Sequence, residues 1–333
     1  MKRLCFLVIC MSIIMGCSTS TSSTKALVDY VDPNIGTAHC RWFFYTPAAI
    51  PFGMAKLAPS TDAHLGNPGG WQAVGYDFRH TSIEGFANFH EFQVGGVVFA
   101  PTVGELQTVP GELENPDGGY RSRFDKKDEV AAPGYYSVLL KDYGVKAELT
   151  AMKRVGFHRY TYPKTEQANL IFDIGNKQGE SGEVKDAEVQ YFEDGRVEGY
   201  VITSPVYVNI YQKGADVRMY FSAVLNKKPV QVGTFVKDVV NPGKHQEKGP
   251  GAGLYMTFST EEQEAVEVKV GLSYTSIENA RFNRETEAAD VTFDQAKKNA
   301  TDVWNESLSR IYVEGGKETD KVKFYTGLFH ALL

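Results

Sequence analysis

Cysteine is scarce in this chain of 333 residues, and its placement excludes a fold held by disulfides. The four cysteines are Cys5, Cys10, Cys17 and Cys40. The first two lie in an amino-terminal secretory signal and the third is the expected lipid attachment site, so only Cys40 remains in the mature domain. The exported domain must therefore be held together by its core, and a chain of this length can bury a large one.

Runs of basic residues are also missing. The chain has 35 Lys and Arg against 41 Asp and Glu, which gives a formal net charge of −6 at pH 7. Loss of Lys2 and Arg3 with the signal would remove two positive charges and take the net charge from −6 to −8. The absence of a basic patch argues against a nucleic-acid partner.

Short catalytic motifs are missing as well. The sequence contains no Walker loop, no Gly-x-Ser-x-Gly and no His-Glu-x-x-His. The function must therefore be inferred from combinations of residues that are spread along the chain.

The amino terminus is typical of an exported lipoprotein. Lys2 and Arg3 precede an apolar run from Leu4 to Met15, which is too short to span a membrane. Gly16-Cys17 and a Ser/Thr-rich stretch follow, as in a bacterial lipobox with a flexible tether. We expect a signal peptide over residues 1–16, lipidation of Cys17, a tether over 17–26, and a periplasm-facing membrane or the cell surface as the location. The alternative is an ordinary signal peptide in which Cys17 has no role.

From Tyr135 onward, short apolar runs alternate with turn residues. Asp194-Gly195 between two such runs is a strong hairpin signal. Regular short strands with few helical windows predict a mainly β fold, a large antiparallel β-sandwich over residues 27–272. The expected strands are Tyr135–Leu140, Val145–Met152, Val155–Tyr162, Asn169–Ile174, Ala187–Phe192, Arg196–Thr203, Tyr207–Lys213, Val217–Val224, Gln231–Phe235, Gly253–Thr257 and Ala265–Leu272.

Beyond Ser273 the pattern becomes helical. Thr292-Phe293-Asp294-Gln295 is a capping box, and apolar residues then recur every three or four positions, which predicts an amphipathic helix within a linker region over 273–318. A second helix is expected from about Thr319 to Leu333, with no Gly, Asn or Pro to end it. It is either the first helix, over 319–333, of a helical domain that is cut short here, or a terminal helix that docks back on the sandwich.

Several short motifs, in order, carry a family resemblance. They are Val31-Asp32-Pro33-Asn34-Ile35-Gly36-Thr37, Pro51-Phe52-Gly53-Met54, Gly75-Tyr76, Gly85-Phe86 followed by His90, Ile277-Glu278-Asn279-Ala280-Arg281, Val303-Trp304-Asn305, Leu308-Ser309-Arg310-Ile311 and Phe324-Tyr325-Thr326. Together they resemble the amino-terminal half of family 92 of the glycoside hydrolases, the calcium-dependent exo-acting α-mannosidases. One departure concerns a Ser-His-x-His run of the family, in which this chain has Asn88 for the first His and keeps the second as His90.

The resemblance implies a fold and a mechanism. The fold is a galactose-mutarotase-like supersandwich followed by linker helices and the start of an (α/α)₆ barrel. The activity is inverting cleavage of mannose-containing glycans, with Ca²⁺ in the intact enzyme. Family members hold the general acid, the general base and most calcium ligands in the helical domain. We therefore expect no catalytic residue and no metal ligand in this chain, a dependence on that C-terminal domain as a partner, and no activity for the chain alone.

The candidate substrate contacts are Trp71, Asp77, His90, Glu91 and Arg41. Trp71 can stack on a pyranose face, and its alternative is a place in the core. Asp77 and Glu91 can accept hydrogen bonds from sugar hydroxyls, and otherwise each is a solvated or capping carboxylate. His90 can bind the sugar or orient Glu91, and otherwise it is a satisfied core histidine. Arg41 can reach a hydroxylated or negative group, and otherwise lies at the surface.

A second class of function stays open. Glycoside hydrolysis needs two carboxylates across the scissile bond, and the clustered candidates here are Asp77, Glu84 and Glu91. If none of them acts as acid or base, the chain is a carbohydrate-binding sandwich module that holds a glycan without cleaving it. A helical domain continuing beyond Leu333 would distinguish the two.

Overall fold

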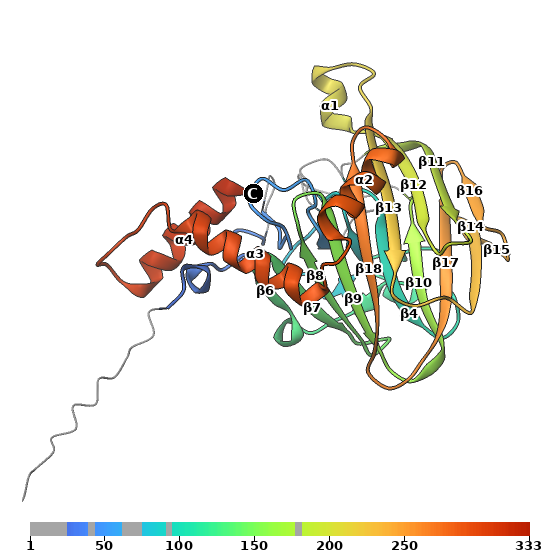
Figure 1. Ribbon diagram of the computed structural model, residues 1–333, viewed down its shortest axis with the longest axis horizontal. Helices are drawn as coiled ribbons and strands as arrows, with labels where there is room; N and C mark the ends of the chain where they lie inside the picture. The colour runs from blue at the N-terminus through green and yellow to red at the C-terminus, as the bar shows by residue number, and fades with distance from the viewer. Residues whose placement is uncertain (1–24, 39–43, 62–74, 91–94, 177–181) are drawn as a thin grey trace, which may run out of the picture.

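The computed structural model describes residues 25–38, 44–61, 75–90, 95–176 and 182–333. Two large antiparallel sheets pack face to face, and helices lie against one end and one outer face of the sandwich (Figure 1). This confirms the predicted antiparallel β-sandwich followed by helices.

The first sheet has seven strands. In order across the sheet they are β1 (Ala58–Ser60), β3 (Gly85–Ala87), β4 (Val98–Val103), β10 (Thr165–Asp173), β17 (Ala252–Thr260), β14 (Gln231–Val236) and β15 (Val239–Pro242).

The second sheet has nine strands. In order they are β16 (Gln246–Lys248), β11 (Glu183–Tyr191), β12 (Val197–Ser204), β13 (Val217–Leu225), β18 (Glu264–Ser273), β9 (Val155–Tyr162), β8 (Val145–Ala151), β7 (Tyr135–Leu140) and β6 (Val130–Ala132). A separate pair joins β2 (Ser82–Ile83) to β5 (Ser122–Arg123). Short 3₁₀ turns lie at Leu27–Tyr30 (η1), Pro116–Gly118 (η2) and Lys126–Asp128 (η3).

Alternation along the strands builds the core. In β18, Val266, Val268 and Val270 are buried between the sheets, whereas Glu267 and Lys269 point to the outer face. Each fully buried valine contributes roughly 1.5–3 kcal/mol relative to exposure. Burial of every second side chain is the pattern that predicts most of the strands after Tyr135.

A series of hydrogen-bonded polar side chains crosses the apolar core. The amide of Asn88, which follows β3, accepts from Nε2 of His158 in β9 at 2.8 Å, and the hydroxyl of Tyr160 lies 2.8 Å from Nδ1 of the same ring. Nδ2 of Asn88 donates to the carbonyl of Val97 at 2.6 Å, which leaves Oδ1 as the acceptor for His158. Burial lowers the pKa of His158 to about 3, so the imidazole is neutral, with its proton on Nε2.

Helix α2 (Ile277–Ala288) packs on β18 and β13 at the outer face of the nine-stranded sheet (Figure 1). Its N-cap Ser276 accepts from the backbone of Asn279 at 3.1 Å. The helix lies so close to the sheet that a Cβ on Gly271 would stand 2.1 Å from the carbonyl oxygen of Ala280. Only glycine permits this approach.

Helix α3 (Phe293–Leu308) begins at the predicted capping box. Thr292 accepts from the backbone of Gln295 at 3.3 Å, and the Gln295 side chain accepts from the backbone of Thr292 at 2.8 Å. Phe293 and Ala296 are buried against β7 and β9. The capped amphipathic helix is confirmed, although Ile311 lies beyond its end and is exposed.

Helix α4 (Glu318–Leu332) packs with α3 and η1 in a small separate core. This core contains Trp304, Tyr325 and Phe329. Trp304 Nε1 donates to the carbonyl of Ala49 at 2.7 Å, and Nζ of Lys56 donates to the carbonyl of Leu333 at 3.0 Å. The helical end is thereby tied to the loop between residues 44 and 57.

One strand prediction is wrong. The run Tyr207–Lys213 was expected to be a strand, but α1 (Val206–Tyr211) is a short helix that projects from the sandwich (Figure 1). Asn209 forms hydrogen bonds with Pro205, Ala215 and Gly214, and these local bonds favour a compact turn. Ile210 is 69% exposed, so its apolar character is not used in a sheet. No helix within the described residues is long and apolar enough to cross a membrane.

Candidate substrate-binding site

Asp77 is fully buried and belongs to an ion pair. Its carboxylate accepts from the backbone N–H of Arg79 at 2.8 Å, from Nε of Arg79 at 2.8 Å and from Nη2 at 2.6 Å. The N–H of Asp77 donates to Oγ1 of Thr61, which also lies 2.9 Å from Nδ1 of His80. These hydrogen bonds hold the turn over residues 77–80 together. The side chain of Arg79 is 45% exposed, so its guanidinium is the part of the turn that faces solvent.

Glu84 is buried against a buried arginine. Nη2 of Arg121 donates to Glu84 at 3.1 Å, and the two side chains are 0% and 3% exposed. Nη1 of Arg121 donates to the carbonyl of Thr61 at 2.6 Å. The carboxylate of Glu84 is therefore engaged in a buried ion pair rather than placed across an open substrate site.

His90 lies against Tyr45. Their rings stack with centroids 4.6 Å apart, and the Tyr45 hydroxyl donates to the carbonyl of His90 at 2.5 Å. Nδ1 of His90 is buried without a hydrogen-bond partner in the described part of the chain. Burial lowers the pKa of His90 to about 3, so the ring is a neutral donor and acceptor. Nε2 lies 3.6 Å from the point where a Cβ on Gly75 would stand, so the glycine leaves space beside the ring.

Tyr76 continues the same site toward β7. Its hydroxyl donates to Glu129 at 2.9 Å, and Tyr136 donates to the same oxygen at 2.7 Å. Nζ of Lys126 donates to the other oxygen of Glu129 at 2.8 Å and lies 4.5 Å from the centre of the Phe78 ring. Desolvation lowers the pKa of Lys126, although Glu129 opposes this shift.

A second histidine approaches from α4. His330 stacks on Phe44 with centroids 4.3 Å apart, and its Nε2 is another buried atom without a partner in the described residues. Burial lowers the pKa of His330 to about 4. Phe44 and Tyr45 are neighbours in the chain, so one short segment supports both histidines.

The structure brings together some of the predicted contacts and adds others. Asp77 and His90 both lie beside the segment at Gly75. The N–H of Asp77 donates to Thr61, whose own N–H donates to the carbonyl of Gly75 at 2.7 Å, and Nε2 of His90 lies 3.6 Å from the position of a Cβ on Gly75. Trp71, Glu91 and Arg41, and the lipidation site Cys17, lie outside the described residues.

The sequence alone did not identify Tyr45, Arg79 or His330 as parts of this site. The aromatic run that ends at Phe44 and Tyr45 was a usable signal, because a solvated loop would not carry such residues. His330 had no signal of its own, since it lies within an ordinary helical pattern.

The described residues do not fit a calcium site. No group of three or more His, Cys, Asp or Glu within the described ranges is placed to hold a metal ion. Asp77 and Glu84 are engaged by arginines, and a neutral imidazole is a poor ligand for Ca²⁺, which prefers oxygen. No step of a reaction can be assigned to a metal held by these residues.

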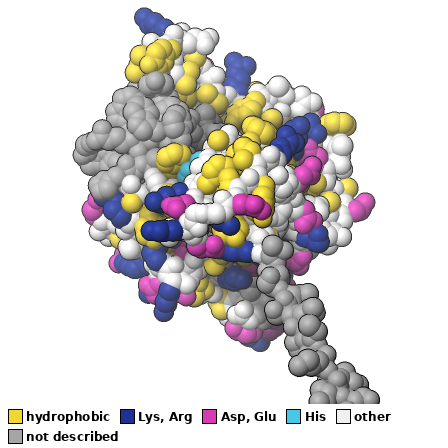
Figure 2. Space-filling view, turned by 90° about the vertical axis from the view of Figure 1, so that its left-hand side faces the viewer, with side chains coloured by type: hydrophobic (Ala, Val, Ile, Leu, Met, Phe, Trp, Pro, Cys, Tyr) yellow, Lys and Arg dark blue, Asp and Glu magenta, His cyan; other side chains and the backbone are white. Residues whose placement is uncertain are grey.

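The face at the α3–α4 end exposes apolar side chains. Phe52 is 70% exposed, Tyr312 65%, Ile311 48% and Phe324 37%. Figure 2 looks onto this end and shows hydrophobic side chains gathered in a band across it. Such a patch is typical of a surface that another domain or protein covers.

The fold is a β-sandwich that leads directly into helices, and the candidate site is a buried cluster of polar and aromatic side chains at that junction. A model of the glycosyl hydrolase family 92 N-terminal domain matches residues 30–273, and a model of the glycosyl hydrolase family 92 catalytic domain matches residues 279–333. The chain therefore belongs to glycosyl hydrolase family 92, as the sequence motifs suggested.

Solved structures agree with this assignment. A family GH92 α-mannosidase from Bacteroides thetaiotaomicron superposes with a TM-score of 0.83 at 30% identity, over 93% of this chain and 41% of that chain. The same enzyme in complex with mannoimidazole gives 0.83 at 29% identity, over 93% and 40%. A family GH92 inverting mannosidase from Bacteroides thetaiotaomicron shares the fold, with a TM-score of 0.76 at 20% identity over 93% and 40%. No curated protein matches. The chain thus spans about two fifths of the length of these solved relatives.

Proposed function

We propose that this chain is the sandwich half, with the first helices, of an exo-α-mannosidase that acts on mannose-containing glycans. The observation that carries the proposal is the match of both family 92 domain models in chain order. The related α-mannosidase whose structure contains mannoimidazole supports mannose as the recognised sugar.

The role of the sandwich is to complete the sugar pocket. The neutral His90 ring with its unpartnered Nδ1, the space beside Gly75 and the guanidinium of Arg79 offer donors and acceptors suited to sugar hydroxyls. Trp71 and Glu91 are proposed to add a stacking surface and an acceptor. The general acid, the general base and the Ca²⁺ ligands are proposed to come from a helical domain that packs on the apolar α3–α4 end.

The test is carried out on a protein in which this chain continues into its family 92 catalytic domain. We expect release of mannose from α-linked mannobiose, loss of activity with a chelator, recovery with Ca²⁺, and inversion of the anomeric centre in proton NMR. Glycan binding without any hydrolysis would instead identify a carbohydrate-binding module. Hydrolysis that is insensitive to chelation, or that retains configuration, would contradict the calcium or the inverting part of the proposal.

The location is a separate proposal. We infer lipidation at Cys17, from the apolar run that ends at Gly16-Cys17. Cys17→Ala should change both the membrane fractionation and the mature mass of the protein. Unchanged fractionation and mass would contradict it.

A further inference from the structure

A strained turn presents Phe52 to solvent at the α3–α4 end of the molecule. The N–H of Gly53 donates to the carbonyl of Ile50 at 3.0 Å and closes a turn of four residues. Phe52 is the third of them and has a φ of 54°, where glycine or asparagine is the usual residue. A bulky side chain in this conformation costs stability. Phe52 is 70% exposed, so burial within this chain does not compensate for the strain.

The turn is fastened on both sides. The N–H of Phe52 donates to the carbonyl of Leu332, the last residue of α4, at 3.0 Å. The N–H groups of Met54 and Ala55 both donate to the carbonyl of Lys153, at 2.7 and 3.2 Å. The backbone of Phe52 is therefore held against the end of α4 while its ring stays in solvent.

A pocket of about 230 Å³ lies beside Phe52. Val303 of α3 and Leu332 of α4 contribute apolar walls, and Glu306 and Arg310 contribute opposite charges. Both charged residues are exposed, and neither side chain forms an ion pair with a residue that the structure describes. The pocket therefore offers apolar surface, a carboxylate and a guanidinium to whatever covers it.

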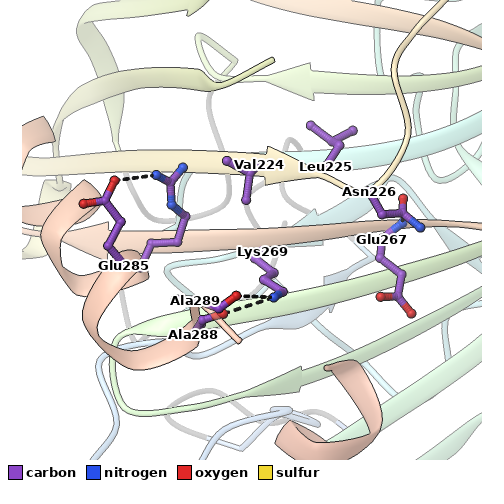
Figure 3. Close-up of a pocket in the computed structure, with 9 residues that line it drawn as sticks. Val224, Leu225, Asn226, Glu267, Lys269, Glu285, Ala288 and Ala289 are labelled. Carbon is purple, nitrogen blue, oxygen red and sulfur yellow. Dashed lines mark hydrogen bonds and ion pairs between the residues drawn. The ribbon is translucent and has the colours of Figure 1, made fainter. Parts of the chain in front are cut away.

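A larger pocket, of about 350 Å³, lies under α2 and differs in this respect (Figure 3). Its Arg284 donates to Glu285 at 3.0 Å. Its Lys269 donates to the carbonyls of Ala288 and Ala289 at 3.0 and 3.2 Å. These charged groups are engaged by neighbours in the same chain, whereas the charges of the pocket beside α3 remain available to another surface.

We propose that Phe52 is the anchor on which the remainder of the family 92 catalytic domain docks. This proposal rests on the two-domain arrangement proposed above. The catalytic-domain model matches residues 279–333, which include α3 and α4, so the turn is hydrogen-bonded to a helix of that domain. The chain covers 41% of a solved α-mannosidase of the same family, so more than half of that relative has no counterpart here.

The pocket defines the chemistry of the docking segment. An apolar side chain of that segment would fill the space beside the Phe52 ring, and an acidic side chain would pair with Arg310. Interfaces are typically dominated by a few aromatic and arginine side chains of this kind. Burial of the ring in the interface would then offset the strain of its backbone, which nothing in the described part of this chain does.

Hydroxyl-radical footprinting read by mass spectrometry tests the contact without any substitution. It compares this chain with a longer protein in which the chain continues into its family 92 catalytic domain. Oxidation of Phe52 should fall severalfold in the longer protein. Oxidation of Val239 in β15, which is 59% exposed at the edge of the sandwich opposite α4, should not change (Figure 1).

Two outcomes of the footprinting would overturn the proposal. One is equal oxidation of Phe52 in the two proteins. The other is protection of Phe52 in this chain alone that disappears on dilution, because it would identify a second copy of the chain as the occupant.

Two glycine variants test the energetics. Phe52→Gly relieves the strained turn, and Gln263→Gly does the same at an exposed control position with a φ of 60° between β17 and β18. In this chain both should raise the Tm by about 2 °C. In the longer protein Gln263→Gly should still raise it, whereas Phe52→Gly should lower it because the anchor is lost. A rise with Phe52→Gly in both proteins would overturn the proposal.

Neither measurement depends on catalysis. A longer protein that releases mannose while Phe52 stays exposed would overturn this inference and leave the proposed function standing. A longer protein that protects Phe52 but hydrolyses nothing would do the reverse.

Discussion

Oδ1 of Asn88 accepts a hydrogen bond from Nε2 of His158 at 2.8 Å, and this bond joins the two sheets through the middle of the apolar core. Asn88 stands where family members often have a histidine, two positions before His90. Here the side chain is fully buried and hydrogen-bonds within the core, so its identity bears on the packing of the two sheets.

Asn88→Ala should lower the free energy of unfolding by about 1–3 kcal/mol, because it leaves His158 Nε2 buried and unpaired and removes the side-chain hydrogen bond to the Val97 carbonyl. Urea denaturation followed by circular dichroism measures the change. The matched control is Asn299→Ala on the exposed side of α3, which should change stability by no more than about 0.5 kcal/mol. Equal effects of the two variants would mean that the buried hydrogen bonds of Asn88 contribute nothing to stability.

Stability should fall as the pH is lowered from about 6.5. Burial lowers the pKa of His90 and His158 to about 3 and that of His330 to about 4 in the folded protein. In this window the unfolded chain binds protons that the folded protein does not, so acid favours unfolding. Each such histidine contributes a slope of up to about 1.4 kcal/mol per pH unit.

Denaturant titrations between pH 7.5 and 4.5 measure this slope, and His158→Gln should make it shallower. The comparison concerns the slope and not the absolute stability, since the substitution also disturbs Tyr160. A slope that is identical in the variant and in the wild type would contradict the assignment to His158.

Glu84→Gln should destabilise the protein by about 3 kcal/mol or more, because it leaves the buried Arg121 cation without its counter-ion. Asp117→Asn is the control. It breaks the ion pair with Arg123, which is exposed and should change stability little. Thermal unfolding of both variants gives the comparison, and a tolerant Glu84 would show that Arg121 is neutralised elsewhere.

In the longer enzyme, His90→Ala, Trp71→Ala and Glu91→Ala should raise KM or change linkage preference, and Asp77→Ala should do so by releasing Arg79. Each lost hydrogen bond to sugar should cost about 0.5–1.5 kcal/mol, and kcat should fall as well if a contact forms only in the transition state. Kinetics on α-1,2-, α-1,3- and α-1,6-linked mannobiose separate these cases. If the variants showed wild-type kinetics on all three substrates, these residues would have structural roles only.

The chain by itself should release no mannose from a yeast-type mannan. An inverting hydrolase needs an acid and a base, and the two candidate carboxylates that lie within the described residues, Asp77 and Glu84, are held by arginines. Measurable release by the purified chain would contradict this and would point to Asp77, Glu84 or Glu91 as the acid–base pair.

The sequence predicted the parts of the fold that depend on local chemistry. The capping box at Thr292 and Gln295 needs only four residues, and the strand predicted at Ala265–Leu272 needs only the alternation of its valines with charged residues. Tyr207–Lys213 was misjudged because its apolar residues resemble a strand, whereas Asn209 and the neighbouring turn decide its conformation.

The site was harder to predict for a physical reason. The sequence shows that position 77 carries a carboxylate. Whether this carboxylate can bind a ligand depends on Arg79, whose side chain folds back and donates to it. The ion pair between Glu84 and Arg121 joins residues that lie 37 positions apart in the chain, so no local sequence pattern predicts it. The sequence singles out His90 as a candidate contact, but its stacking partner Tyr45 comes from a distant loop that no local pattern connects to it.

The bond from Trp304 to the carbonyl of Ala49 has a practical consequence for anyone who builds chimeras within this family. The loop that carries Phe44 and Tyr45 is fastened to α3, so a graft joined at residue 273 would separate that loop from its anchor. A crossover placed after α4 keeps the indole, the loop and both histidines from one parent.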